Sequence, residues 1–153
     1  MDMAVEAPFS KYKINTYIIT AVVLIGFASY CVYDGYFNET FIEKHTKDGV
    51  PSSTLAFNQK APPVLFLGGL VFSWLAFSSR KKKIVADESQ ITDGKKIVKF
   101  DSIGKIDKTY FESKGYFVIT YTEAGGGSRQ WKISDRNYEN LGALLDHTVS
   151  KIS

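Results

Sequence analysis

The residues best suited to chemistry are few in this chain of 153 residues. Nucleophilic catalysis needs a nucleophile, a base and an orienting group close together, and neither His45 nor His147 belongs to such a group. The single cysteine, Cys31, falls inside an apolar run, so one chain can form neither a disulfide nor a cysteine-based metal site. Ser73 is isolated within a second apolar run. We therefore predict no enzymatic activity, no metal site and no cofactor.

Two further patterns that could bind phosphate or nucleic acid are incomplete. The glycine run Gly125–Gly127 lacks the strand-to-helix context and the Lys followed by Ser or Thr of a phosphate-binding loop. It is better suited to the tip of a β-hairpin. Most cations are spread among acidic residues, and the one block of four, Arg80–Lys83, directly follows an apolar run. We therefore expect no nucleic-acid partner.

The first apolar run extends from Ile14 to Tyr33 and contains no charged residue. A helix of about twenty residues spans roughly 30 Å, the thickness of the hydrocarbon core of a bilayer. A signal peptide is the alternative, but it would end in small residues, whereas Tyr30–Asp34 is bulky and charged. The sequence therefore predicts a retained transmembrane helix over residues 14–36, with tyrosines at both ends as interfacial anchors.

A second apolar run covers residues 62–79, close to the shortest length that can span a bilayer. Pro62 and Pro63 favour a helix that begins here, because the first helical residues need no hydrogen-bonding N–H group. The same run could instead form a buried core helix of a soluble protein. Two apolar runs on either side of a polar segment, residues 37–61, favour a transmembrane hairpin.

The flanking charges predict the orientation of this hairpin. Lys11 and Lys13 precede the first run, and Arg80–Lys83 follow the second, whereas residues 37–61 carry cations and acids in similar number. Cytoplasmic flanks of membrane helices are rich in Lys and Arg. We therefore predict that both termini are cytoplasmic and that the loop 37–61 is exoplasmic.

The polar remainder consists of a cytoplasmic tail, residues 1–13, and a cytoplasmic domain, residues 80–153, which is long enough for one small core. Short β-branched and aromatic runs separated by turn residues predict antiparallel strands in this domain. The expected strands cover residues 84–86, 96–100, 103–108, 115–122 and 129–133. In the last of them, Trp131 and Ile133 share one face.

The pattern changes to a helical period near the C-terminus, where Ser134 or Asp135 could cap the start of a helix. The side chains that share one helical face are Tyr138, Leu141, Leu145, Thr148, Val149 and Ile152. We expect Trp131 and Ile133 to pack against this face. The predicted fold is therefore α+β: a two-helix transmembrane hairpin followed by a small antiparallel β-sheet or barrel capped by a C-terminal α-helix.

The order of these elements resembles a bacterial pleckstrin-homology-like (PH-like) domain, from about Lys82 to Ser153. The residues that carry the resemblance are the turn Ile91–Ile97, the step Phe100–Ile103, the strand Gly115–Thr122, the glycine-rich hairpin and the terminal helix. The whole chain is similar to small bacterial proteins that join a membrane hairpin to such a domain, which implies the bacterial inner (cytoplasmic) membrane. A full PH barrel has seven strands, whereas the pattern predicts five or six.

The resemblance implies binding of lipids, peptides or proteins and does not choose among them. We predict a non-enzymatic interaction module or accessory subunit of a larger membrane complex, whose partner is a membrane protein. The alternative is a membrane-tethered module that binds anionic lipid headgroups. The candidate headgroup contacts are Arg80, Lys81, Lys82, Lys83, Lys95, Lys96 and Lys99. The same lysines could be ordinary solvated charges.

Small residues could bring helices together in the membrane, because they let backbones approach closely. The candidate packing face contains Gly26 in the first run, with Gly68, Gly69 and Ser73 in the second. This face could contact the other helix of the hairpin, a partner subunit or a second copy of the chain. Glycines that are merely tolerated in a lipid-facing helix are the alternative.

Overall fold

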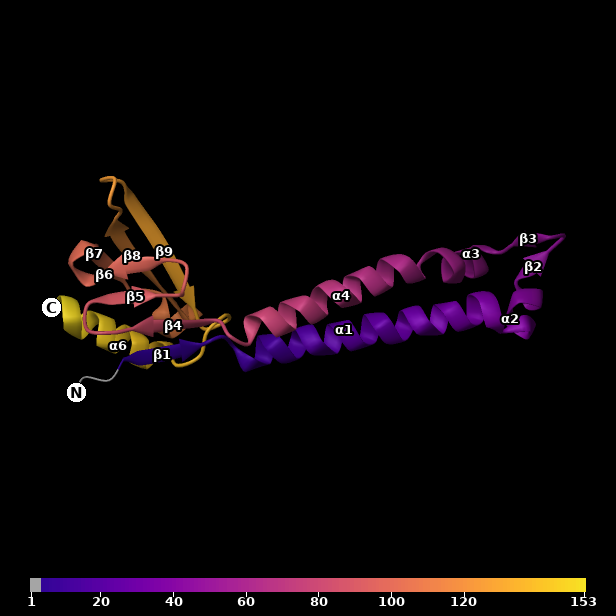
Figure 1. The fold of residues 1–153 in the computed structure, drawn as a ribbon, viewed down its shortest axis with the longest axis horizontal. Helices are drawn as coiled ribbons and strands as arrows, with labels where there is room; N and C mark the ends of the chain where they lie inside the picture. Colours follow the sequence, from indigo (N-terminus) through magenta and orange to yellow (C-terminus); the bar gives the residue numbers. More distant parts are fainter. Residues whose placement is uncertain (1–3) are drawn as a thin grey trace. The chain divides into compact units, whose positions relative to one another are not determined.

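The computed structural model describes residues 4–153 and divides the chain into two compact units. One unit is the continuous segment Ile14–Phe77, called here the hairpin unit. The other, called here the sheet unit, joins the N-terminal residues up to Lys13 to the C-terminal stretch Ser78–Ser153. The predicted combination of apolar helices, antiparallel sheets and a C-terminal helix is confirmed (Figure 1).

The sheet unit contains a four-stranded and a three-stranded antiparallel sheet. The first has the strand order β1-β4-β5-β6, and the second has the order β7-β8-β9. The strands are β1 (Val5–Pro8), β4 (Lys83–Ala86), β5 (Gln90–Thr92), β6 (Ile97–Lys99), β7 (Ile103–Asp107), β8 (Tyr116–Thr122) and β9 (Ser128–Ser134). The longest pairing joins β8 to β9, and every residue of β8 is aromatic or β-branched.

Strand β1 is the main difference from the sequence-based prediction, which treated residues 1–13 as a tail. It pairs with β4 in antiparallel register, so that Ala7 lies opposite Ile84 and both side chains are fully buried. Lys83 closes the outer face of this pair with a salt bridge of 2.6 Å to Glu6. With β1 included, the described residues of the sheet unit form seven strands rather than five or six.

The remaining strand predictions are confirmed within about two residues at each end, and three further elements of the sheet unit were missed. β5 is only three residues long, too short to show an alternating pattern. The 3₁₀ turn η2 (Phe100–Ser102) and the helix α5 (Phe111–Lys114) are single turns between strands. Gly94 has a φ of 87°, which confirms the predicted turn between β5 and β6.

The C-terminal helix α6 (Leu141–Ile152) begins later than the sequence pattern indicates. Asn140 occupies its N-cap in a left-handed conformation, whereas the predicted caps lie earlier. Ser134 is the last residue of β9, and its carbonyl accepts the N–H group of Asn137 at 3.0 Å in a turn. Tyr138 therefore precedes the helix and forms an isolated bridge to Phe9.

The core of the sheet unit lies between α6 and the two sheets, and the predicted packing of Trp131 and Ile133 with the helix is confirmed. Leu144 is fully buried beside Leu145, although the sequence pattern did not select it. The buried core residues are Ala7, Ile84, Ala86, Ile91, Val98, Phe100, Phe117, Ile119, Tyr121, Trp131, Ile133, Leu141, Leu144 and Leu145.

The hairpin unit is built on two long apolar helices that run side by side (Figure 1). α1 (Lys11–Val32) continues into a π-helical turn η1 (Tyr33–Phe37), and α4 (Pro62–Ser79) begins at the predicted residue. Between them lie α2 (Glu39–Lys44), β2 (Thr46–Lys47), β3 (Val50–Pro51) and α3 (Ser53–Lys60). Asn38 and Ser52 cap α2 and α3 by accepting the N–H groups of Phe41 and Leu55.

Small residues line the contact between α1 and α4. Ala21 and Ala28 on α1 and Ala76 on α4 are buried. A Cβ atom on Gly69 would lie 2.5 Å from Cγ1 of Ile25, so any larger residue here would have to displace that side chain.

The other members of the predicted packing face differ in position. A Cβ atom on Gly68 would lie 3.3 Å from Cδ1 of Leu24. The hydroxyl of Ser73 donates to the carbonyl of Gly69 within its own helix, at 2.9 Å. Gly26 lies on α1 but faces open space.

Candidate functional site

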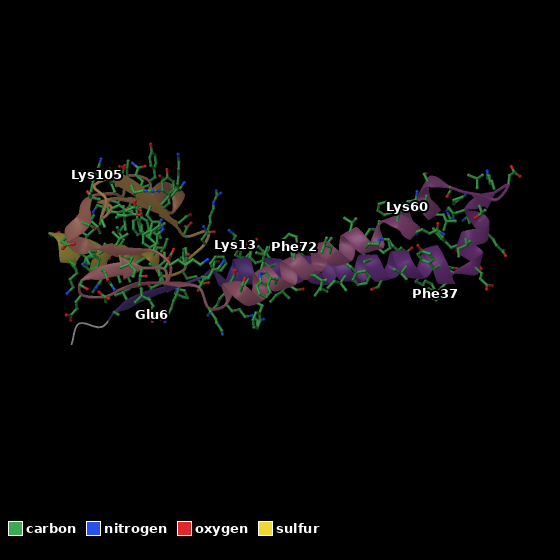
Figure 2. The ribbon with its side chains drawn as sticks, turned by 45° about the horizontal axis from the view of Figure 1, so that its top comes forward. Glu6, Lys13, Phe37, Lys60, Phe72 and Lys105 are labelled. Atoms are coloured by element: carbon green, nitrogen blue, oxygen red, sulfur yellow. The ribbon has the colours of Figure 1, made fainter. Side chains whose placement is uncertain are left out.

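The surface of the hairpin unit is the first candidate site. Two helical segments, Lys11–Phe37 and Pro62–Ser79, are long and apolar enough to cross a membrane. Around Phe72 the side chains that project from this unit consist mostly of carbon (Figure 2). Val22, Leu70 and Trp74 are each more than 60% exposed, at 65%, 62% and 69%. A monomeric soluble protein rarely leaves so continuous an apolar surface uncovered.

The segment that connects α1 to α4 is polar and closely packed. Asp34 is buried within the π-helical turn, and its carboxylate accepts the side-chain amide of Asn38 at 2.9 Å. Gly35 approaches α3 so closely that a Cβ atom would lie 3.0 Å from the carbonyl oxygen of Asn58. The side chain of Gln59 donates to the carbonyl of Gly35 at 3.0 Å. These contacts hold the connecting segment against α1.

The cationic block Arg80–Lys83 lies where α4 joins β4. Its four side chains are exposed, but two of them have partners on the N-terminal segment. Lys83 pairs with Glu6, and the ammonium of Lys82 lies 5.7 Å from the ring centre of Phe9. This block therefore also helps to attach β1 to the sheet.

The other predicted headgroup contacts do not converge on one pocket. Lys95 is exposed in the turn between β5 and β6. The ammonium of Lys96 lies 5.0 Å from the ring centre of Trp131, a cation–π geometry that places it over β9. Lys99 lines a separate cleft of about 440 Å³, together with Ile97 and Tyr121. The headgroup contacts predicted from the sequence thus lie on several different surfaces.

A cleft that the sequence did not predict lies between α5, the start of β8 and the end of β9. Its volume is about 430 Å³. The residues that line it are Ser113, Lys114, Tyr116, Lys132, Ser134 and Arg136. Three of them are cations and none is acidic. We call this group the basic cleft.

A sequence signal for the basic cleft does exist. Trp131 and Ile133 point into the core, so period-two alternation places Lys132 and Ser134 together on the outer face, and Arg136 continues the same spacing. The contribution of Lys114 could not be predicted in this way, because the pairing of β8 with β9 and the one-turn helix α5 bring it there.

His45 and His147, the residues considered for catalysis, each contact another part of the fold. No three His, Cys, Asp or Glu side chains among residues 4–153 are grouped as metal ligands. A ring nitrogen of His147, Nε2, lies 2.9 Å from the carbonyl oxygen of Asp87, which attaches α6 to the turn after β4. The ring of His45 stacks on Phe41, with their centres 4.0 Å apart.

The chain matches no family model, no curated protein and no solved structure. Its function must therefore be argued from its own residues and geometry.

Proposed function

We propose that this protein is a membrane-anchored, non-enzymatic interaction module. The hairpin unit spans the bilayer through α1 and α4, and the sheet unit is held at the cytoplasmic face, where it binds a partner membrane protein as an accessory subunit. The exposed apolar side chains of α1 and α4 support the anchor. The membrane would remove them from water, and each large apolar side chain gains about 1.5–3 kcal/mol on full transfer.

The observation that carries this proposal is the pairing of β1 with β4. β1 precedes α1, and β4 follows α4. Their backbones form one hydrogen-bonded ladder from Val5↔Ala86 to Pro8↔Lys83. A folded ladder cannot be divided between the two sides of a bilayer, because its backbone groups must be paired within one compartment. Both ends of a membrane-inserted hairpin therefore emerge on the same side, and the cations at both ends favour the cytoplasm.

The architecture of the sheet unit also supports the proposed PH-like character. Its four-stranded and three-stranded antiparallel sheets, closed by the helix α6, agree with the strand number of a full PH barrel. In this interpretation the membrane hairpin is an insertion between the first and second strands of the domain. Such a domain is a platform for binding, and its fold alone does not name the partner.

Two measurements on the full chain test the proposal. Membranes from expressing cells are washed with alkaline carbonate, which removes peripheral proteins, and then extracted with a mild detergent. We expect the chain to resist carbonate, to dissolve only in detergent, and to migrate on a native gel as a species larger than the purified chain alone. Release by carbonate would overturn the anchor. A free monomer in native extracts would overturn the accessory-subunit role.

A further inference from the structure

We propose that the basic cleft binds a phosphate group, carried either by a soluble compound or by a lipid headgroup. The cleft collects five polar side chains from two segments that are distant in sequence, Ser113–Lys114 and Lys132–Arg136. This site differs from the predicted headgroup contacts, which lie on other surfaces of the sheet unit. The proposal rests on the sheet unit alone and does not depend on the membrane anchor.

The basic cleft carries positive charge that no acidic residue of its lining neutralises. Lys114, Lys132 and Arg136 face no carboxylate within it. The two salt bridges found among the described residues, Lys83 with Glu6 and Arg129 with Glu123, use none of these cations. Three like charges in one concave surface repel one another, and a bound anion relieves that repulsion.

The two lysines are held in place by a pair of stacked tyrosines. The rings of Tyr110 and Tyr116 lie 5.6 Å apart at an angle of 29°. The ammonium of Lys114 lies 4.5 Å from the ring centre of Tyr110, and that of Lys132 lies 3.8 Å from the ring centre of Tyr116. Cation–π contacts of this kind restrict the lysine rotamers and leave N–H groups to donate to a ligand.

Arginine and hydroxyl groups complete the donor set. The backbone N–H group of Arg136 donates to the hydroxyl oxygen of Ser134 at 3.3 Å, so that hydroxyl keeps its own proton to donate. Ser113 supplies a second hydroxyl from α5. The guanidinium of Arg136 can donate two parallel hydrogen bonds to neighbouring oxygens of one phosphate.

This donor set suits phosphate better than carboxylate. A carboxylate offers two oxygens and one negative charge, whereas a phosphate monoester offers three oxygens and up to about two charges near neutral pH. Two acids neighbour the lining residues in sequence, but Asp135 lies against Gly115 and Glu112 lines a different cleft, so neither side chain lines this one. Three cations with two hydroxyls therefore complement a phosphate, which carries more negative charge and more acceptor oxygens than a carboxylate.

The position of the cleft makes both sources of phosphate accessible. The turn that follows Arg136 is bound to the residues that begin α1, because the carbonyl of Asn137 accepts the N–H group of Ser10 at 2.8 Å and its side-chain oxygen accepts the ammonium of Lys13. A headgroup beside the start of α1 would thus lie near this turn. A soluble phosphate compound reaches the same exposed side chains from the solvent.

The test uses the full chain in phosphatidylcholine nanodiscs and follows backbone amide resonances by NMR. Inorganic phosphate and inorganic pyrophosphate are added separately, with acetate at equal ionic strength as the comparison. We expect saturable shifts in residues 113–116 and 132–136 with the phosphates, tighter for pyrophosphate, and weaker shifts with acetate. Absence of shifts in these residues, or equal shifts with acetate, would overturn the proposal.

A charge-matched pair of variants separates the cleft from general electrostatic attraction. Lys132→Gln with Arg136→Gln removes two positive charges from the cleft, and Lys105→Gln with Lys151→Gln removes two from elsewhere on the sheet unit. The first variant should bind pyrophosphate at least about tenfold more weakly, since each charge-assisted hydrogen bond lost is worth about that factor. The second should change binding less than about twofold. Equal weakening by both pairs would refute a specific site.

A lipid arm of the same experiment identifies the source of the phosphate. The full chain is placed in nanodiscs that contain phosphatidic acid in phosphatidylcholine. If a headgroup is the ligand, the resonances of the cleft shift before any addition, and pyrophosphate then binds only in competition. If the ligand is soluble, they shift only when pyrophosphate is added. Both results are consistent with a phosphate site. If the resonances of the cleft shift under neither condition, the site is ruled out, whether or not the hairpin spans the membrane.

Discussion

At the scale of single residues, Gly115 shows how one position connects the core to the basic cleft. It ends α5 in a left-handed conformation with a φ of 68°, and its carbonyl accepts the N–H group of Asp135 at 2.8 Å. The carboxylate of Asp135 occupies the space that a Cβ atom on Gly115 would need. The sequence predicted a strand start here but gave no sign of this close approach, because it depends on the turn after β9.

Gly115→Ala should destabilise the sheet unit by about 1–3 kcal/mol, since it adds left-handed strain and displaces Asp135. Gly126→Ala is the matched control, because Gly126 also has a positive φ, of 84°, but faces open space. Thermal unfolding of both variants, followed by Trp131 fluorescence in a Trp74→Phe background, measures the difference. Equal destabilisation by the two substitutions would show that the Asp135 side chain can move aside without a loss of stability.

Asp87 predicts an acid-dependent contribution to stability. Hydrogen bonds from the backbone N–H groups of Ser89 and Gln90 and from the Ser89 hydroxyl hold the pKa of this carboxyl below its ordinary value of about 3.9. A carboxyl whose pKa is lower in the folded state stabilises the fold above its unfolded pKa, and that stabilisation is lost as the pH falls through the folded pKa.

Asp87→Asn should therefore lower stability at neutral pH and reduce the loss of stability below about pH 4. Urea unfolding between neutral and acid pH measures this slope, and Glu88→Gln removes the same charge from the neighbouring residue as a control. An unchanged slope in Asp87→Asn would mean that the turn after β4 does not depend on this carboxylate.

At the scale of the elements, the sequence predicted the longer elements that have a clear periodic pattern. The apolar length of α4, the alternation of β8 and β9 and the helical period of α6 all depend on neighbouring residues. β1 could not be predicted in this way, because Val5–Pro8 is short, ends in proline and finds its partner beyond the entire hairpin unit. The basic cleft was missed for the same reason, since strand pairing assembles it.

Gly69→Leu tests the packing of the hairpin. The new side chain would have to displace Ile25, so we expect separation of α1 and α4 and a loss of about 1–3 kcal/mol. Gly26→Leu places the same side chain where nothing lies within 4 Å and should be close to neutral. Thermal stability in detergent compares the two. If Gly69→Leu were as stable as Gly26→Leu, the helices would not be packed at this point.

Leu145→Asp tests the contact of α6 with the sheets. A carboxylate without a partner would be placed in the core beside Trp131 and Ile133, which costs several kcal/mol and should unfold the sheet unit. Ala143→Asp puts the same group on the exposed face of α6 and should leave the unfolding transition in place. A cooperative transition retained in Leu145→Asp would mean that α6 does not cover the core.

At the scale of the whole molecule, the chain builds one domain from its two ends. The sheet that begins with β1 is completed only after the hairpin unit has been synthesised, because β4 follows α4. Closing so long a loop slows the pairing of β1 but adds little to its free-energy cost. A fragment that starts at β4 lacks the strand that covers Ile84, so binding studies require the full chain.

Cysteine labelling of intact cells tests the central claim, that the hairpin spans the membrane and that both of its ends return to the cytoplasm. Ser53 and Ser113 are both exposed, in the connecting segment and in the sheet unit respectively. In a Cys31→Ala background, Ser53→Cys should react with a membrane-impermeant maleimide, and Ser113→Cys should react only after the membrane has been opened. Labelling of Ser113→Cys in intact cells, with Ser53→Cys protected, would contradict this topology.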